Sequence, residues 1–199
     1  MEKLGSASQP RILAAALKLF ADRGYAGTSI QDIVDAARVT KPTLYYYFQS
    51  KAGLFQALID WAHEERFRII EAAAGRGVTL EEQLVEILAA LFAFIQKRRD
   101  LMRIAFATAF AARGELPPEI KYLEKATRNL DLFESLIKQA LTAGTLDPRF
   151  DSREVAFGIY GMMTIKVMNC LVRPREKLSR EDAVKVVQLF LHGAARRPS

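Results

Sequence analysis

The sequence predicts an all-α protein with a three-helix N-terminal domain and a larger helical C-terminal domain. Apolar residues recur at the three- and four-residue spacing of amphipathic helices. No segment shows the sustained two-residue alternation that is typical of a strand. Helix caps and glycine or proline breaks divide the 199 residues into about nine helical segments.

The first three expected helices are short and closely spaced. The first has an apolar face and ends near Gly24, and that face contains Leu13, Ala16, Leu17 and Phe20. The second covers residues 28–37 and starts with a capping box from Thr28 to Gln31. The third covers residues 40–48, with Thr40 as N-cap and a proline in its first turn.

The remaining helices follow from the same signals. Ser50 caps a fourth helix that extends to the glycines near residue 75. Capping boxes that start at Thr79 and Asp151 begin two later helices. We expect the last five helices at residues 80–97, 100–112, 119–143, 152–172 and 180–193. The domain boundary is expected between residues 1–52 and 53–199.

The charge distribution favours an anionic partner. The net charge is +6, from 29 basic and 23 acidic residues. No acidic residue lies between Asp35 and Asp60, whereas Lys41 and Lys51 lie there among threonine and tyrosine hydroxyls. Such a segment suits contact with phosphates.

The sequence offers little for catalysis or metal binding. The single cysteine, Cys170, excludes an intrachain disulfide, and the two histidines lack the spacing of zinc ligands. No nucleophile with a base and no paired carboxylates are evident, so we expect no enzyme activity and no cofactor. A redox role for Cys170 is the alternative to inert packing in an apolar helix.

No membrane partner is expected. The longest run without a charge, residues 155–165, is shorter than the ~20 apolar residues that cross a bilayer. The first residues lack the basic segment and apolar core of an export signal. These observations predict a cytoplasmic protein.

The second and third helices have the lengths and the tight connection of a helix-turn-helix, whose second helix can enter the major groove of DNA. The alternative is an ordinary helical hairpin within a core. A core helix would not carry a lysine, a threonine and three tyrosines in so few positions.

Residues 11–59 resemble the DNA-binding domain of the TetR family. The resemblance rests on Gly24-Tyr25, on Thr28-Ser29-Ile30, and above all on residues 43–48, Thr-Leu-Tyr-Tyr-Tyr-Phe, followed by Ser50-Lys51. It implies that Thr28, Tyr47 and Lys51 contact phosphates and that the third helix contacts bases. The candidate DNA-binding residues are therefore Thr28, Arg38, Thr40, Lys41, Pro42, Thr43, Tyr45, Tyr46, Tyr47 and Lys51.

Three positions depart from the usual family pattern. Arg38 and Pro42 replace glycines that are common there, and Gly53 stands where an acidic residue often follows the Ser50 cap. A left-handed backbone at Arg38 would cost conformational strain. A phosphate contact from its side chain would offset that cost.

Beyond about residue 60 the resemblance is weaker, but the succession of helices matches the family architecture. It implies a homodimer in which the last two helices form a four-helix bundle with the second subunit. The helix at 152–172 is apolar almost all round, so it needs a partner on two sides. The last helix carries the expected interface residues Val184, Val187 and Leu191.

Aromatic and methionine residues of the C-terminal helices are numerous enough to line an apolar cavity for a small molecule. The candidate ligand-binding residues are Phe92, Phe106, Phe110, Phe133, Glu134, Tyr160, Met163 and Lys166. Most such side chains in proteins simply pack. Glu134 and Lys166 align with apolar positions, which favours an inward orientation. Alternatively, Lys166 extends to solvent and Glu134 pairs with Lys138.

Together these features predict a transcriptional repressor that a small, largely apolar effector releases from a double-stranded DNA operator. The sequence leaves activation open as the opposite sign of regulation. Two other classes remain as alternatives: a helical carrier or enzyme that shares the fold, and a DNA-organising protein without a ligand.

Overall fold

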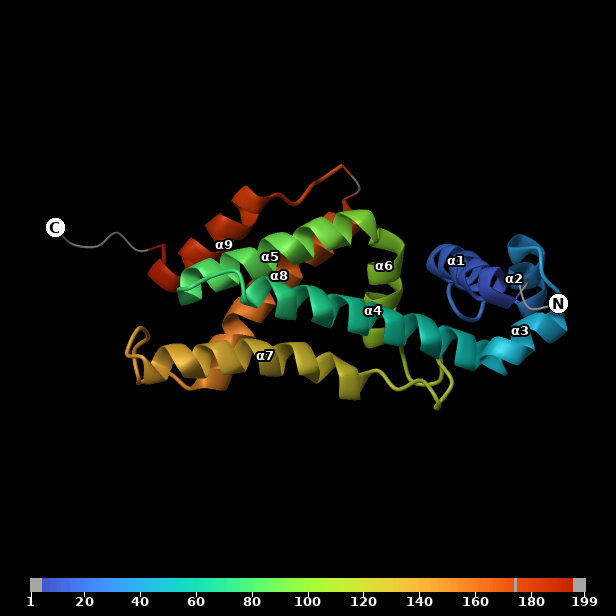
Figure 1. The fold of residues 1–199 in the computed structure, drawn as a ribbon, viewed down its shortest axis with the longest axis horizontal. Helices are drawn as coiled ribbons and strands as arrows, with labels where there is room; N and C mark the ends of the chain where they lie inside the picture. Colours follow the sequence, from blue (N-terminus) through green and yellow to red (C-terminus); the bar gives the residue numbers. More distant parts are fainter. Residues whose placement is uncertain (1–4, 174, 195–199) are drawn as a thin grey trace. The chain divides into compact units, whose positions relative to one another are not determined.

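The computed structural model describes residues 5–173 and 175–194, and in these residues it contains nine α-helices and no strand (Figure 1). The helices are α1 (Gly5–Arg23), α2 (Ile30–Ala37), α3 (Lys41–Phe48), α4 (Lys51–Ala74), α5 (Leu80–Lys97), α6 (Arg99–Ala109), α7 (Leu123–Thr142), α8 (Ser152–Val172) and α9 (Arg180–His192). The expected all-α class is confirmed.

The described residues form two compact units. The first contains residues 5–64 and 98–125, and the second contains residues 65–97 and those from 126 onward. The long helix α4 contributes to both. This division differs from the expected boundary at residue 52, because α6 and the segment after it pack with the N-terminal helices.

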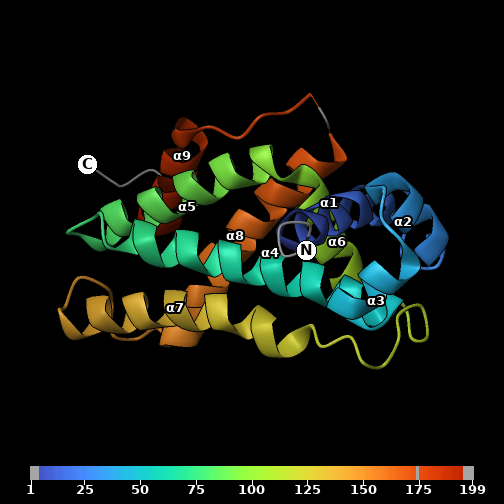
Figure 2. The same cartoon turned by 45° about the vertical axis from the view of Figure 1, so that its right-hand side comes forward.

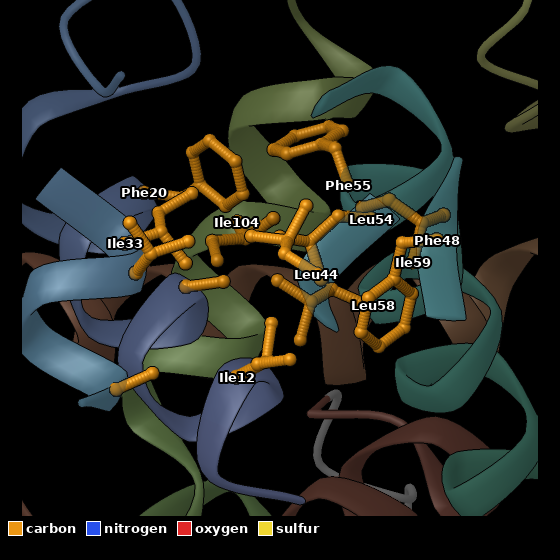
Figure 3. Close-up of a cluster of buried hydrophobic side chains, with 13 residues drawn as sticks. Ile12, Phe20, Ile33, Leu44, Phe48, Leu54, Phe55, Leu58, Ile59 and Ile104 are labelled. Atoms are coloured by element: carbon orange, nitrogen blue, oxygen red, sulfur yellow. The ribbon is translucent and has the colours of Figure 1, made fainter. Parts of the chain in front are cut away.

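The N-terminal unit has a core to which every helix of the unit contributes (Figure 3). Ile12, Ile33 and Leu44 come from α1, α2 and α3 and have no exposed surface. Leu54 and Leu58 of α4 are equally buried. Ile104 of α6 joins the same cluster. Burying each such side chain stabilises the fold by roughly 1.5–3 kcal/mol, so these contacts fix the positions of α2 and α3.

The cap of α2 lies one residue later than expected. Ser29 is the N-cap: its Oγ accepts the backbone N–H of Asp32, and the Asp32 carboxylate accepts the N–H of Ser29. The Gln31 amide instead donates to Asp35. A charged carboxylate is the stronger acceptor, which favours the Ser29–Asp32 pair over the expected Thr28–Gln31 pair.

The turn between α3 and α4 explains the glycine at position 53. The Oγ of Ser50 accepts the backbone N–H of Gly53 at 2.9 Å, which confirms the expected cap of α4. A Cβ added at Gly53 would lie only 2.2 Å from the carbonyl oxygen of Phe48. The tight turn therefore requires glycine at this position.

In the second unit, α9 packs along α5 and against α8, and Figures 1 and 2 both show α5 and α9 side by side. The contact of α8 with α9 is close at Gly158, where an added Cβ would lie 3.0 Å from the ring of Phe190. Leu88, Ile159 and Val187 are completely buried. These contacts form the core of this unit.

The longest apolar helix, α8, is largely uncovered. By length and composition alone, this helix is long and apolar enough to cross a membrane. The expectation of no such helix rested on its uncharged run of residues 155–165, which is shorter than the helix. Only 28% of its most apolar window is buried within the protein. Phe157, Ile165 and Val172 are exposed along it. Core helices of soluble proteins have the same composition.

Candidate nucleic-acid interface

The connection between α2 and α3 is a left-handed turn at Arg38, with φ 52° and ψ 49°. The backbone N–H of Arg38 donates to Asp35, and that of Val39 donates to Val34. These bonds satisfy the last carbonyls of α2. The left-handed backbone that costs conformational strain at a non-glycine residue is therefore present at this arginine.

The side chain of Arg11 on α1 donates hydrogen bonds to this turn. The Nη2 atom of Arg11 lies 2.5 Å from the carbonyl oxygen of Ala37 and 2.9 Å from that of Arg38. A cation at the C-terminal end of a helix also interacts favourably with the helix dipole. Arg11 therefore joins α1 to the helix-turn-helix at its turn.

Helix α3 begins at the cap that the sequence predicts. The Oγ1 atom of Thr40 accepts the backbone N–H of Thr43 and lies 2.9 Å from the Thr43 hydroxyl. Pro42 lies in the first turn. These features order the start of a helix that has only eight residues.

The two faces of α3 differ in chemistry. Leu44 and Phe48 are buried in the core, as expected. On the opposite face Lys41 and Pro42 are exposed, and Tyr45 and Tyr46 are 45% and 81% exposed. Large aromatic rings so exposed to water are unusual unless they serve a partner.

The two expected phosphate contacts near the turn between α3 and α4, Tyr47 and Lys51, are half-buried. The ring of Tyr47 packs against the core and lies edge-on to Tyr46, with ring centroids 5.1 Å apart. The Nζ atom of Lys51 lies 4.2 Å from the centre of the Tyr25 ring. Burial lowers the pKa of Lys51. A phosphate bound here would exchange this cation–π contact for a direct ion pair.

Thr28 is placed differently from the expectation. Its side chain is buried, and its hydroxyl donates towards the carbonyl oxygens of Gly24 and Leu19, at 2.9 Å and 3.2 Å. Thr28 therefore fixes the turn between α1 and α2, and its hydroxyl does not face a phosphate. The expectation of a direct side-chain contact was wrong, because the sequence did not show these two carbonyl acceptors.

The structure separates the expected ligand-binding aromatic residues into two sets. Phe92, Phe133 and Met163 are buried in the second unit, and the Phe133 ring lies edge-on to that of Tyr160 at 5.7 Å. Phe106 and Phe110 belong to the first unit. The ring of Phe110 is 73% exposed.

The two charged candidates do not extend into an apolar cavity. The carboxylate of Glu134 lies 2.6 Å from Lys138 and 2.7 Å from Arg153. Hydrogen bonds from Lys138 and then from Arg153 lower the pKa of Glu134. Lys166 is exposed, so its expected inward orientation was wrong. The long side chain of Lys166 can reach solvent from an apolar helix.

The expected dimer residues are only partly available to a second subunit. Val184 and Leu191 are half-buried. Val187 has no exposed surface, so it cannot contact a partner, and this expectation is corrected. On α8 and α9 the exposed large apolar residues are instead Phe157, Ile165, Val172 and Leu189. For the three residues on α8, the sequence signal was that residues 152–172 are apolar almost all round.

Within residues 5–173 and 175–194, no group of three or more histidine, cysteine or acidic side chains has an arrangement that would hold a metal ion. The Cys170 thiol is buried, with its sulfur 3.4 Å from the carbonyl oxygen of Glu176.

The exposed surface of α3 in the first unit carries hydroxyl, aromatic and cationic groups. A braced helix-turn-helix with such a surface defines the class of DNA-binding helix-turn-helix proteins.

Comparisons with known proteins agree with this class. The sequence profile described as "Bacterial regulatory proteins, tetR family" matches residues 12–58. The HTH-type transcriptional regulator YdgC of Bacillus subtilis is 30% identical over 97% of this chain and 95% of its own length. The regulator AcrR of Shigella flexneri is 26% identical over 92% of this chain and 87% of its own.

Solved structures show the same fold. FadR of Bacillus subtilis in complex with stearoyl-CoA has a TM-score of 0.80 at 20% identity, covering 94% of this chain and 99% of its own. The TetR family regulator PfmR of Thermus thermophilus has a TM-score of 0.77 at 22% identity, covering 94% and 100%. The chain belongs to the TetR family. It is a DNA-binding transcriptional regulator of that type.

Proposed function

We propose that this regulator is a homodimeric, cytoplasmic repressor that binds its operator through α3 and leaves it when a small, largely apolar effector binds. The observation that carries the DNA-binding part is the exposed face of α3. Lys41, Pro42, Tyr45 and Tyr46 protrude there from a helix that the core holds through Leu44 and Phe48. Tyrosine and lysine side chains supply hydrogen-bond donors for base edges and phosphates.

The two-fold arrangement is supported by α8 and α9. Phe157, Ile165 and Val172 fall within one face of α8, since they are eight and seven residues apart. With Leu189 of α9 they leave an apolar surface that a second copy would cover. Val184 and Leu191 lie at half-buried positions of α9 and belong to the same proposed interface.

An effector site in the second unit is supported by its aromatic core. Phe92, Phe133, Tyr160 and Met163 lie on helices of this unit, and a ligand that separated them would change how those helices pack. The relative FadR binds stearoyl-CoA in its crystal structure. A long apolar effector of this kind agrees with such a core. Release of DNA then follows if the effector favours a dimer whose two α3 helices no longer match the operator.

The function is tested by selecting DNA. Purified full-length protein is incubated with a random-sequence duplex pool, and bound sequences are enriched and sequenced. We expect a two-fold symmetric motif, because a symmetric dimer contacts two equivalent half-sites. The variant Tyr46→Ala should yield no motif or a relaxed one, whereas Gln139→Ala, at an exposed position of α7, should yield the same motif.

Repression is tested with a reporter promoter that contains the selected motif. Repression lowers expression when the regulator is present, and activation raises it. Enrichment of no motif would overturn the DNA-binding assignment, and a rise in expression would overturn the repressor assignment alone. Thermal stabilisation of the protein by small-molecule extracts, but not by buffer, tests the effector separately.

A further inference from the structure

The first unit contains a cavity beside its DNA-binding helices. Its volume is about 360 Å³. Residues from the end of α1, from α4, from α6 and from the segment after α6 line it, and all of them belong to this unit. The cavity is therefore separate from the aromatic core of the second unit.

One wall of the cavity consists of three aromatic rings in mutual contact. The rings of Phe20 and Phe55 lie edge-on at 5.0 Å, those of Tyr25 and Phe55 at 5.1 Å, and those of Phe20 and Tyr25 are stacked at 5.9 Å. Figure 3 shows Phe20 and Phe55 near Ile104 of α6, which also lines the cavity. Such a wall suits a flat aromatic ligand.

A strap formed by residues 110–122 covers another side. It is fastened to α4, because the Gln56 amide accepts the backbone N–H of Lys121 at 2.8 Å and donates to its carbonyl oxygen at 3.3 Å. Leu116 packs against the core and lines the cavity. Gly114 lies at the cavity edge with φ +88°, a conformation that favours glycine.

The polar groups at the cavity favour a ligand with a negative charge. The carboxylate of Glu115 already accepts the backbone N–H of Ala112, and the hydroxyl of Thr108 already donates to Ile104. Arg23 is paired with Asp32 only at 3.9 Å and in an exposed position, where ion pairs contribute little. Its guanidinium is thus available to form a charge-assisted pair with a carboxylate.

The Tyr25 hydroxyl is a second donor at this site. Burial, and then the charge of Glu119, raise the pKa of Tyr25, so the phenol stays protonated at neutral pH. A ligand carboxylate beside Arg23 would therefore have the Tyr25 phenol as a second donor, and the Glu115 carboxylate that lines the cavity is already bonded to the Ala112 N–H. The apolar floor of alanine and isoleucine side chains would receive the ring.

We propose that this cavity binds a compact aromatic carboxylate and is a second ligand site, distinct from the effector site proposed above. Its ligand would contact the turn at residues 24–26, which leads directly into the cap of α2. It would also contact α6 and the strap. Binding there stabilises the present packing of α6 and the strap on the DNA-binding helices.

The full-length protein with ¹³C-labelled alanine methyl groups tests this site by NMR, with 2-naphthoate as the probe and no DNA present. Saturable shifts are expected at Ala26, Ala107 and Ala111, which line the cavity. The methyl groups of Ala140 and Ala143 are the internal control, because they line a different cavity in the second unit. Shifts confined to Ala140 and Ala143, or no saturable shifts, would overturn the proposal.

Three variants make the test specific. Arg23→Gln should lower the affinity for 2-naphthoate at least tenfold and leave the affinity for the neutral probe 2-naphthalenemethanol unchanged. Lys18→Gln, outside this cavity, should change neither affinity. Ala107→Phe should fill the cavity and abolish the binding of both probes. Circular dichroism establishes that this variant is folded. Equal affinity of wild type and folded Ala107→Phe would overturn the site. Equal affinity of wild type and Arg23→Gln for 2-naphthoate would overturn the carboxylate.

Discussion

The guanidinium of Arg11 donates to the carbonyl oxygen of Arg38, the one residue of the helix-turn-helix connection that has a left-handed backbone. The same atom also donates to Ala37. One side chain of α1 thus holds the end of α2, on which the direction of α3 depends.

Arg11→Met should lower the free energy of unfolding by about 1 kcal/mol, because two carbonyl oxygens lose a charged donor at an exposed site. Urea unfolding followed by circular dichroism measures this. Selectivity for the operator over random DNA should fall as well, since the turn is less well held. Lys18→Met, on the same helix and exposed, is the matched control. Equal stability of Arg11→Met and wild type would show that the two bonds contribute nothing.

Lys51→Ala should weaken binding to operator and to random DNA by the same factor. The loss of one phosphate contact lowers the slope of log K against log salt by about 0.9. Fluorescence anisotropy at several salt concentrations measures the slope. An unchanged slope would show that Lys51 does not contact a phosphate and that its role is the contact with the Tyr25 ring.

Tyr46→Ala should behave differently from Lys51→Ala. If its exposed ring contacts base edges, the loss is about 1–3 kcal/mol at the operator and much smaller at random DNA. Competition between the two duplexes gives the ratio directly. Equal losses on both would assign Tyr46 to the DNA backbone. Lys41→Ala and Tyr45→Ala extend the comparison along the same face.

Much of the fold could be predicted from the sequence because helix ends carry local signals. Thr40, Ser50, Thr79 and Asp151 act as the expected caps. The predicted helix ends were less accurate where the sequence has no cap residue to mark them. Helix α6 stops at Ala109 and α7 begins at Leu123, so the segment with the two adjacent prolines is longer than expected.

The residue types of the candidate sites could be predicted from the sequence, but the directions in which their side chains face could be predicted less well. Apolar residues at helical spacing define a buried face, yet the sequence does not say whether the same protomer or a partner covers it. Val187 illustrates this, since the protomer itself buries it completely. Thr28 could not be placed either, because the carbonyl oxygens that its hydroxyl contacts belong to residues four and nine positions earlier.

Asp32→Asn should destabilise the protein at neutral pH. Side-chain and backbone hydrogen bonds from Ser29 lower the pKa of Asp32 in the folded state. Its contribution is therefore complete above the unfolded pKa, about 3.9, and is lost as the pH falls through the lower folded pKa. Urea midpoints of variant and wild type should differ at pH 7, begin to converge as the pH falls below about 4, and coincide only below the folded pKa of Asp32. Asp22→Asn, exposed on α1, is the control, and a difference independent of pH would contradict the role of this carboxylate.

The last prediction compares two apolar residues of the second unit that have opposite environments. Ile165 is 65% exposed on α8, whereas Val187 of α9 has no exposed surface. A carboxylate at position 187 would be buried without a partner, which costs several kcal/mol, so Val187→Asp should unfold the protomer. A carboxylate at position 165 remains in water in the monomer and is buried only in the proposed dimer.

Ile165→Asp should therefore retain the helical circular dichroism of the wild type and sediment as a monomer. A monomer presents a single α3 helix, so affinity for the two-fold operator should collapse while weak, salt-sensitive binding to random DNA persists. Analytical ultracentrifugation and DNA binding on the same sample measure both effects. Val78→Asp, which also adds a carboxylate at an exposed apolar position but lies before α5, is the control and should stay dimeric. If Ile165→Asp is folded, dimeric and fully able to bind the operator, the exposed face of α8 is not the interface, and the second subunit must be sought on another surface.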